Sequence, residues 1–227
     1  MQLSGFIKQS LIDYPGMIAA VVFTQGCNLN CPYCHNPQLI SSTAGTIPVS
    51  ETLRYFTKNR LLLDAVVITG GEPTLQKDLP QYLSAIKQLG LKVKLDTNGV
   101  TPDILSRLLS LGLIDYVAMD IKSELTPAAY SRASGVVFTK EAAGRIRQSA
   151  RLIIDSGIPH EFRTTVCREL VTPENIRALL QELDGARQYF LQQYRPPAQQ
   201  RPASRQLSAC TTEEMAVLAQ SLNVKWR

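Results

Sequence analysis

Residues 18–35 read IAAVVFTQGCNLNCPYCH and join a short apolar segment to a loop that holds three cysteines. Ile18–Thr24 is short and rich in branched apolar residues, a composition typical of a buried strand. Gly26 and Cys27 follow directly, and in parallel βα folds the active site gathers at the carboxyl ends of the strands. The stretch therefore predicts a buried strand that delivers a cysteine-rich loop to a functional site.

The same strand-like composition recurs five times, at Ala65–Thr69, Lys92–Asp96, Tyr116–Ile121, Glu161–Val166 and Arg187–Gln192. Helical patterns occur at Ser50–Asn59, Leu79–Leu89, Pro102–Leu111, Lys140–Ser156, Pro173–Leu183 and Thr212–Leu222. Thr101 and Thr172 each place a capping hydroxyl before a proline at the first helical position. Strands that alternate with helices indicate a parallel sheet with right-handed crossovers. We expect an α/β fold, an incomplete (βα)6 TIM-like barrel, with a doubly wound open sheet as the alternative.

Length and composition narrow the class of protein. The 227 residues suit one domain, with a core at about residues 17–195 and a C-terminal loop and helix at 196–227. No apolar run is long enough to cross a membrane, and Met1–Gly5 lacks the features of a signal peptide, so we expect a cytoplasmic protein. The net charge of +5 comes from scattered residues without a basic and aromatic stripe, so no nucleic-acid partner is expected.

Unusual residues follow each predicted strand. Gly70-Gly71-Glu72-Pro73 comes after the second strand, and Asp96-Thr97-Asn98-Gly99 comes after the third. Asp120-Ile121-Lys122 ends the fourth, Arg163 lies in the fifth, and Gln192-Gln193-Tyr194-Arg195 leaves the sixth. Because the carboxyl ends of parallel strands meet at one edge of the sheet, these segments should point into one cavity.

The cysteine loop suggests an iron–sulfur cluster. Cys27, Cys31 and Cys34 are spaced by four and three residues, so a short loop can wrap one face of a four-iron, four-sulfur cluster. Three thiolates leave one iron without a protein ligand, and that iron can bind a substrate or cofactor. An odd total of five cysteines argues against a disulfide framework. We interpret Cys167 and Cys210 as ordinary buried or incidental cysteines.

Other chemistries fit parts of this loop. Cys31-Pro32-Tyr33-Cys34 alone matches a glutaredoxin-type dithiol, and Cys31 to His35 spells the C-x-x-C-H of c-type haem attachment. Three cysteines with His35 could hold zinc, although adjacent Cys34 and His35 would strain to reach one ion. The tight spacing of the three cysteines in a polar loop argues against three buried free thiols. We interpret His35 as a structural neighbour of the loop and His160 as incidental, because no hydrolytic triad is visible.

The pattern C-x3-C-x2-C, with an aromatic residue before the last cysteine, resembles the signature of the radical S-adenosylmethionine superfamily. Gly70-Gly71-Glu72-Pro73 resembles its second motif. Further motifs resemble one branch, the activating enzymes of glycyl-radical proteins, and most closely those of anaerobic ribonucleoside-triphosphate reductases. These motifs are Asp13-Tyr14-Pro15-Gly16, Gly26-Cys27, Cys34-His35-Asn36-Pro37, Gly70 through Leu75, Asp96 through Gly99 and Asp120-Ile121-Lys122.

The resemblance implies a mechanism and partners. The open iron would chelate S-adenosylmethionine, and an electron from the cluster would cleave its sulfonium bond to give methionine and a 5′-deoxyadenosyl radical. That radical would abstract hydrogen from a glycine of a partner protein, anaerobic ribonucleotide reductase, with flavodoxin or ferredoxin as electron donor. The alternatives are a radical enzyme with a small-molecule substrate, as in modified-base synthesis, and a C-x-x-C thiol-redox or metal-binding module.

The resemblance also implies roles for the residues around the cluster. Tyr33 would lie against adenine, and Gly70 and Gly71 would let the backbone approach the methionine end closely. Glu72 would accept a hydrogen bond from the bound ammonium. Asp96, Thr97 and Asn98 would contact the ribose or a small cation. Asp120 would be a further ligand of that cation. The positively charged side chains of Lys122 and Arg163 would lie near the carboxylate of the cofactor.

Overall fold

The computed structural model describes residues 1–41, 45–196 and 201–227 and contains an eight-stranded sheet. The strands are β1 (Leu3–Ser10), β2 (Ala19–Thr24), β3 (Ala65–Gly70), β4 (Lys92–Thr97), β5 (Tyr116–Asp120), β6 (His160–Val166), β7 (Tyr189–Gln193) and β8 (Lys225–Trp226). They lie in chain order from β1 to β8, with β1 antiparallel to β2 and every later pair parallel. A doubly wound sheet needs a reversal in this order, so the prediction of an incomplete parallel barrel is confirmed.

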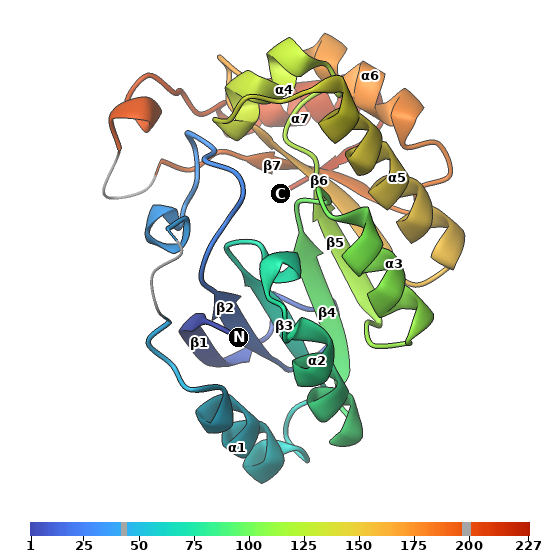
Figure 1. The fold of residues 1–227 in the computed structure, drawn as a ribbon. Helices are drawn as coiled ribbons and strands as arrows, with labels where there is room; N and C mark the ends of the chain where they lie inside the picture. Colours follow the sequence, from blue (N-terminus) through green and yellow to red (C-terminus); the bar gives the residue numbers. More distant parts are fainter. Residues whose placement is uncertain (42–44, 197–200) are drawn as a thin grey trace.

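The helices are α1 (Val49–Asn59), α2 (Leu79–Gln88), α3 (Pro102–Ser110), α4 (Pro127–Ser134), α5 (Lys140–Ser156), α6 (Pro173–Glu182) and α7 (Thr212–Leu222). Figure 1 shows α2, α3 and α5 side by side along one face of the sheet. The main core lies between that face and these helices, where side chains such as Ile68 and Leu95 are fully buried. Each parallel strand is thereby covered on its convex side.

All six predicted strands and six predicted helices are present, with their ends moved by a few residues. Two strands and one helix were missed: β1, β8 and α4. β1 lies at the edge of the sheet and is only partly buried, so its residues lack the apolar run of an inner strand. β8 has two residues, too few for any pattern. The sheet therefore extends at both ends beyond the predicted core of residues 17–195.

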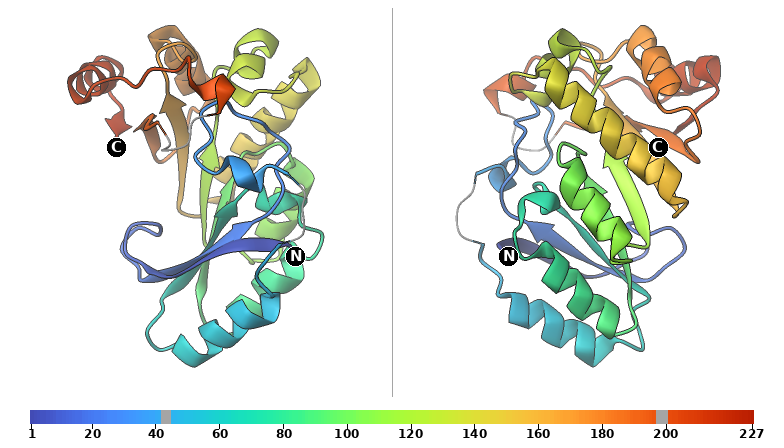
Figure 2. Two further views of the ribbon diagram at one scale, coloured as in Figure 1. Left: turned by 90° about the vertical axis from the view of Figure 1, so that its left-hand side faces the viewer. Right: turned by 45° about the vertical axis from the view of Figure 1, so that its right-hand side comes forward.

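The concave face of the sheet has two different halves. On β2 and β3 it carries small apolar side chains such as Ala19 and Val67, and Tyr14 from the β1–β2 loop packs against them. This loop projects from the sheet on the side away from α2, α3 and α5 (Figure 2). On β4 and β6 the concave face carries charged side chains instead, at Lys94 and Arg163 among others. The polar half faces the space in which the functional site lies.

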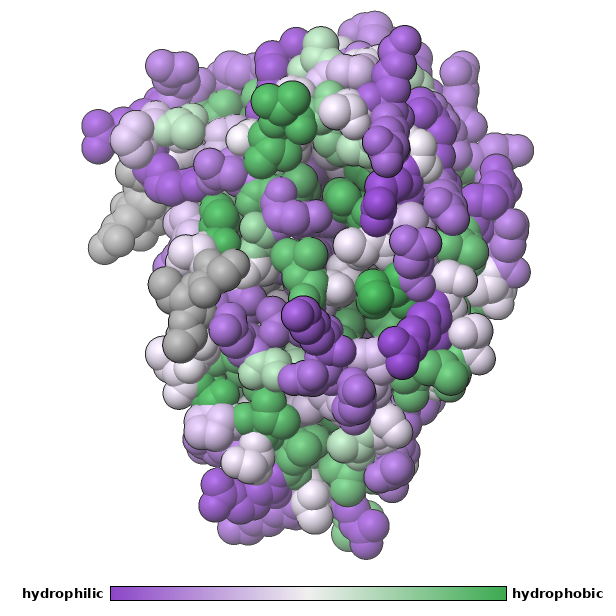
Figure 3. All heavy atoms as spheres, viewed as in Figure 1, coloured by the Kyte–Doolittle hydropathy of each residue, from purple (hydrophilic) through white to green (hydrophobic). Residues whose placement is uncertain are grey.

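The outer surface is mixed in character. Figure 3 shows hydrophilic residues over much of one face, with apolar residues between them. Two of the most exposed apolar side chains, Leu11 and Ile12, lie in the β1–β2 loop. Among the described residues, no helix is both long and apolar enough to cross a membrane.

Candidate active site

A cavity of about 270 Å³ lies at the carboxyl ends of β3 to β7 and beneath the cysteine loop. Every residue that the sequence singled out for the site lies on its wall: Cys27, Cys31, Tyr33, Cys34, Gly70, Gly71, Glu72, Asp96, Thr97, Asn98, Lys122 and Arg163. The structure thus brings the predicted residues together. Their individual roles remain predictions.

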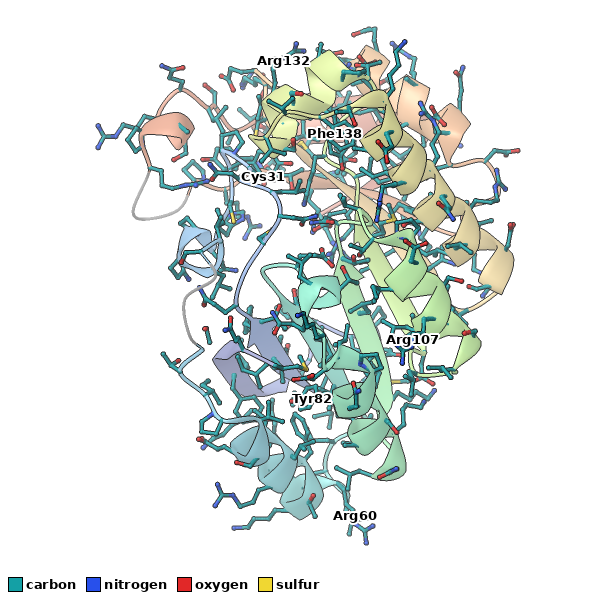
Figure 4. The ribbon with its side chains drawn as sticks, in the orientation of Figure 1. Cys31, Arg60, Tyr82, Arg107, Arg132 and Phe138 are labelled. Atoms are coloured by element: carbon teal, nitrogen blue, oxygen red, sulfur yellow. The ribbon has the colours of Figure 1, made fainter. Side chains whose placement is uncertain are left out.

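The backbone of the cysteine loop is held from two directions. Cys27 donates its N–H to the carbonyl of Ile40 at 3.1 Å, and Asn30 donates to the carbonyl of Ser134 at 2.9 Å. Gly135, which ends α4 with a φ of +69°, packs so closely that a Cβ there would lie 2.0 Å from the Asn30 carbonyl oxygen. Figure 4 shows Cys31 on this loop, on the same side of the molecule as α4. The loop is therefore positioned by α4 as well as by β2.

The C-terminal segment also contacts the cysteine loop. Arg201 donates to the Asn30 side-chain oxygen at 2.7 Å and to the carbonyl of Cys31. His35 Nε2 lies 2.8 Å from the carbonyl oxygen of Arg195, which agrees with its interpretation as a structural neighbour of the loop. Residues 197–200 of the predicted C-terminal loop lie outside the described residues.

Burial disfavours ionisation of two of the three thiols. It raises the pKa of Cys27 to about 11 and raises that of Cys31, and the Lys122 ammonium partly offsets both shifts. Without a ligand, the Cys27 and Cys31 thiols are therefore protonated at neutral pH, and binding of iron must release their protons. Thiolates are the usual ligands of iron–sulfur clusters, so the donor set fits the predicted cluster.

The other two cysteines do not line this cavity. Cys167 is fully buried and pairs with Ala209 in an isolated β-bridge. Cys210 is half-buried. Among the described residues, no group of three or more His, Cys, Asp or Glu side chains is placed to hold a single metal ion. The zinc site with His35 therefore has no support in this geometry.

Glycine is needed at positions 70 and 71 because a side chain there would collide with neighbouring backbone atoms. Gly70 has a φ of +111°, and a Cβ there would lie 2.4 Å from the backbone nitrogen of Thr24. A Cβ on Gly71 would lie 2.1 Å from the carbonyl oxygen of Gly26. The Gly70-Gly71 turn therefore lies close against the end of β2 and the start of the cysteine loop, and its close approach to a ligand stays a prediction. Glu72 strengthens the contact between the turn and the loop by donating its N–H to the Gly26 carbonyl at 2.8 Å.

The carboxylate of Glu72 is 1% exposed and accepts four hydrogen bonds. Oε1 accepts from the Thr74 N–H, the Thr74 hydroxyl and the Thr97 hydroxyl, at 3.1, 2.5 and 2.8 Å. Oε2 accepts from the Asn98 N–H at 2.7 Å, which leaves it the capacity for another donor such as a bound ammonium. Glu72 therefore ties the ends of β3 and β4 together on the cavity wall.

Protein cations already occupy the two carboxylates of the predicted small-cation site. Lys94 Nζ lies 2.6 Å from Asp96, while Arg163 lies 2.6 Å from Asp120 and 3.6 Å from Asp96. Lys122 Nζ lies 3.2 Å from Asp120. Burial opposes ionisation of Asp120, but Arg163 and Lys122 outweigh it and hold its pKa well below the usual range. The cation site remains a prediction that this geometry does not support.

Tyr33, the aromatic residue before the last cysteine of the motif, lines the cavity. Its side chain is buried, and its hydroxyl has no hydrogen-bond partner among the described residues. Burial raises its pKa, and Cys31 and Tyr130 lie near enough to raise it further. The ring lines the cavity, so the proposed contact with adenine remains open to test.

A second cavity, of about 480 Å³, adjoins the first and was not predicted. The β1–β2 loop contributes Ile12, Asp13 and Pro15 to its wall, and the sheet contributes the following side chains: Lys94, Asp96, Glu161, Arg163, Thr165, Gln192, Gln193 and Arg227. A signal was available in the sequence, because Glu161, Arg163 and Thr165 occupy every second position of a strand and so share one face.

Comparison with known proteins agrees with this geometry. The model of the Radical SAM superfamily matches residues 21–166. A proposed glycyl-radical enzyme activating enzyme of Methanocaldococcus jannaschii is 35% identical over 86% of this chain and 80% of its own length. A pyruvate formate-lyase-activating enzyme of Streptococcus mutans is 34% identical over 65% of this chain and 58% of its own length. A 7-carboxy-7-deazaguanine synthase of Hyperthermus butylicus is 31% identical over 72% of this chain and 73% of its own length.

The fold itself recurs in solved structures. A radical SAM methyltransferase from Sphaerobacter thermophilus superposes with a TM-score of 0.72 over 94% of this chain and 66% of its own, at 16% identity. At that identity the likeness concerns the fold alone. The family model covers more than half of the chain, across the cysteine loop, the Gly70-Gly71 turn and the ends of β4 to β6. The chain therefore belongs to the radical SAM superfamily, and its relatives include activating enzymes of glycyl-radical proteins.

Proposed function

We propose that the protein generates a glycyl radical on a partner protein, an anaerobic ribonucleoside-triphosphate reductase, with flavodoxin or ferredoxin as electron donor. The observation that carries the proposal is the pair of adjoining cavities, one beneath the three cysteines and one beside the β1–β2 loop. A polypeptide segment needs such a second space next to the site of radical formation. The activating-enzyme relatives support this choice of substrate class.

Cys27, Cys31 and Cys34 would hold a four-iron, four-sulfur cluster, which supplies the electron that cleaves bound S-adenosylmethionine. The protein's own groups would position that cofactor. Oε2 of Glu72 offers an acceptor for its ammonium, and Lys122 and Arg163 offer positive charge for its carboxylate. Because both cations are also paired with Asp120, the cavity does not hold a large uncompensated charge.

The thiol-redox alternative conflicts with the electrostatics of the loop. A reactive dithiol needs at least one cysteine whose pKa lies near or below neutral. Burial raises the pKa of Cys31, the first cysteine of the C-x-x-C pair, instead of lowering it. Neutral buried thiols of this kind are poor nucleophiles.

The small-molecule alternative is supported by the likeness to 7-carboxy-7-deazaguanine synthase. A purine-like substrate would also find polar groups on the concave face. The two functions differ in what they leave on a protein partner, because only the glycyl-radical function produces a persistent protein radical. The same assay therefore separates them.

The test starts with anaerobic reconstitution with iron and sulfide. The wild-type protein should become brown and bind about four irons, and Cys27→Ala should lose most of that iron, while Cys210→Ala should retain it. The reduced enzyme is then incubated with S-adenosylmethionine and a candidate reductase. A glycyl-radical doublet in electron paramagnetic resonance supports the proposal. A competent enzyme that cleaves S-adenosylmethionine but gives no doublet with any candidate reductase would refute it.

A further inference from the structure

The two cavities share one wall, and this wall is where a substrate must meet the cofactor. The residues common to both cavities are His35, Asp96, Arg163, Thr165 and Gln192. Thr165 on β6 and Gln192 on β7 are direct neighbours in the parallel register. Both point to the concave face, since both line the cavities there, and both are half-buried.

Three of the five shared side chains are already engaged. Asp96 and Arg163 are held in ion pairs, and His35 Nε2 contacts the Arg195 carbonyl. Thr165 and Gln192 differ, because their side chains make no hydrogen bond within the described residues 1–41, 45–196 and 201–227. They are therefore the shared-wall groups that can bind a ligand without first breaking an internal contact.

The chemistry of this pair suits a neutral polar group. A glutamine amide offers a carbonyl acceptor and an N–H₂ donor side by side, and a threonine hydroxyl can donate or accept. A peptide group presents the complementary pair, a C=O and an N–H. The nearby charges are already compensated, with Glu161 paired to Arg227 at 2.6 Å and Arg163 to Asp120 at 2.6 Å. The pair therefore fits the main chain of an extended polypeptide better than a charged group.

We propose that Gln192 and Thr165 bind the main chain of the partner segment and hold its glycine at the junction of the two cavities. The inference rests on the proposed function and deepens it by assigning substrate-positioning residues. It also gives a reason for the β1–β2 loop to project there. The segment enters past Ile12, whose side chain is 91% exposed at the rim of the second cavity.

The experiment measures glycyl-radical formation against partner concentration for holoenzyme variants. Gln192→Ala should raise the KM for the partner roughly tenfold, the effect of losing one or two neutral hydrogen bonds. It should also raise the amount of 5′-deoxyadenosine formed per glycyl radical, because an unheld glycine lets cleavage proceed unproductively. Gln188→Ala, at an exposed glutamine just before β7, is the matched control and should behave as wild type.

Thr165 supplies a second test that does not depend on the folding of the first variant. Thr165→Val removes the hydroxyl while keeping the shape and should raise KM, whereas Thr165→Ser should restore it. A purely structural role would instead lower melting temperature and cluster content with KM unchanged. If both Gln192→Ala and Thr165→Val show the wild-type KM and the wild-type amount of 5′-deoxyadenosine per glycyl radical, the inference is overturned while the proposed function stands. Failure of the wild-type enzyme to form any glycyl radical would overturn the proposed function and the inference with it.

Discussion

Substitution of Gly71 by alanine tests the contact on which the site's geometry depends. The added Cβ would lie 2.1 Å from the Gly26 carbonyl oxygen, 2.7 Å from its carbon and 3.1 Å from the Leu39 carbonyl oxygen. All three are backbone atoms, so no side chain can move aside to relieve the clash. The φ of Gly71 is not in the left-handed region, so the effect is steric and not conformational.

Overpacking against a fixed neighbour costs about 1–3 kcal/mol, and a backbone neighbour on both sides places Gly71→Ala near the upper end. For a chain of this length, about 3 kcal/mol lowers the melting temperature by roughly 6–12 °C. The same displacement moves the start of the cysteine loop, so iron content after reconstitution should fall as well. Differential scanning calorimetry of the unreconstituted protein separates the packing effect from the loss of cluster.

Two other glycines provide matched controls with different expected signs. Gly144 lies inside α5, and a Cβ added there would have no neighbour within 4 Å, so Gly144→Ala should stabilise the protein by about 0.5–1 kcal/mol. Gly90 also has open space but a φ of +80°, so Gly90→Ala should cost about 1–2 kcal/mol from backbone strain alone. If Gly71→Ala melts at or above the wild-type temperature, the close contact with Gly26 does not exist in solution.

Two further substitutions probe contacts that the sequence did not reveal. Arg201→Met should speed the loss of iron from reconstituted protein to a chelator several-fold, because Arg201 holds the backbone of the cysteine loop at Cys31, and equal loss rates would contradict this. His160 is buried, and burial lowers its pKa below the ordinary value, so the unfolded chain takes up its proton first on acidification. The free energy of unfolding of the wild type should therefore fall from about pH 7.5 to about pH 5.5, around the ordinary histidine pKa. In His160→Gln the fall should shrink, and identical pH profiles in urea denaturation would count against this role.

β2, β3 and β5 were predictable from the sequence because they are buried on both faces and read as largely apolar runs. Edge elements were not, since β1 mixes exposed and buried positions and β8 contains two residues. Thr172 caps α6 as predicted, with a side chain that accepts from the Asn175 N–H at 3.3 Å. Thr101 makes no side-chain capping bond to α3, and its hydroxyl instead donates to the Thr74 hydroxyl at 2.5 Å. The Thr101 hydroxyl thus makes a tertiary contact with Thr74 in place of the local capping bond.

The candidate site was predictable as a set of residues, because parallel strands deliver their ends to one edge. Their partners were not predictable, since the pairing of Asp120 with Arg163 depends on the register between β5 and β6. His160, interpreted as incidental to the chemistry, also has a structural contact that the sequence did not reveal. Its Nε2 accepts the Arg187 N–H at 3.2 Å and so links β6 to the segment before β7.

The charged half of the concave face has a cost that packing alone would not justify. Buried ion pairs stabilise less than apolar side chains of similar size, because desolvation offsets most of their attraction. A fold selected only for stability would also place on β4 and β6 the apolar side chains that β2, β3 and β5 carry on this face. Instead Lys94, Asp96, Arg163, Glu161 and Arg227 form a continuous paired network along that face. Such a network keeps the space wide and polar while its own charges remain satisfied. Under the proposed function, recognition of the partner's main chain would then fall to the few neutral groups left unengaged, Gln192 and Thr165.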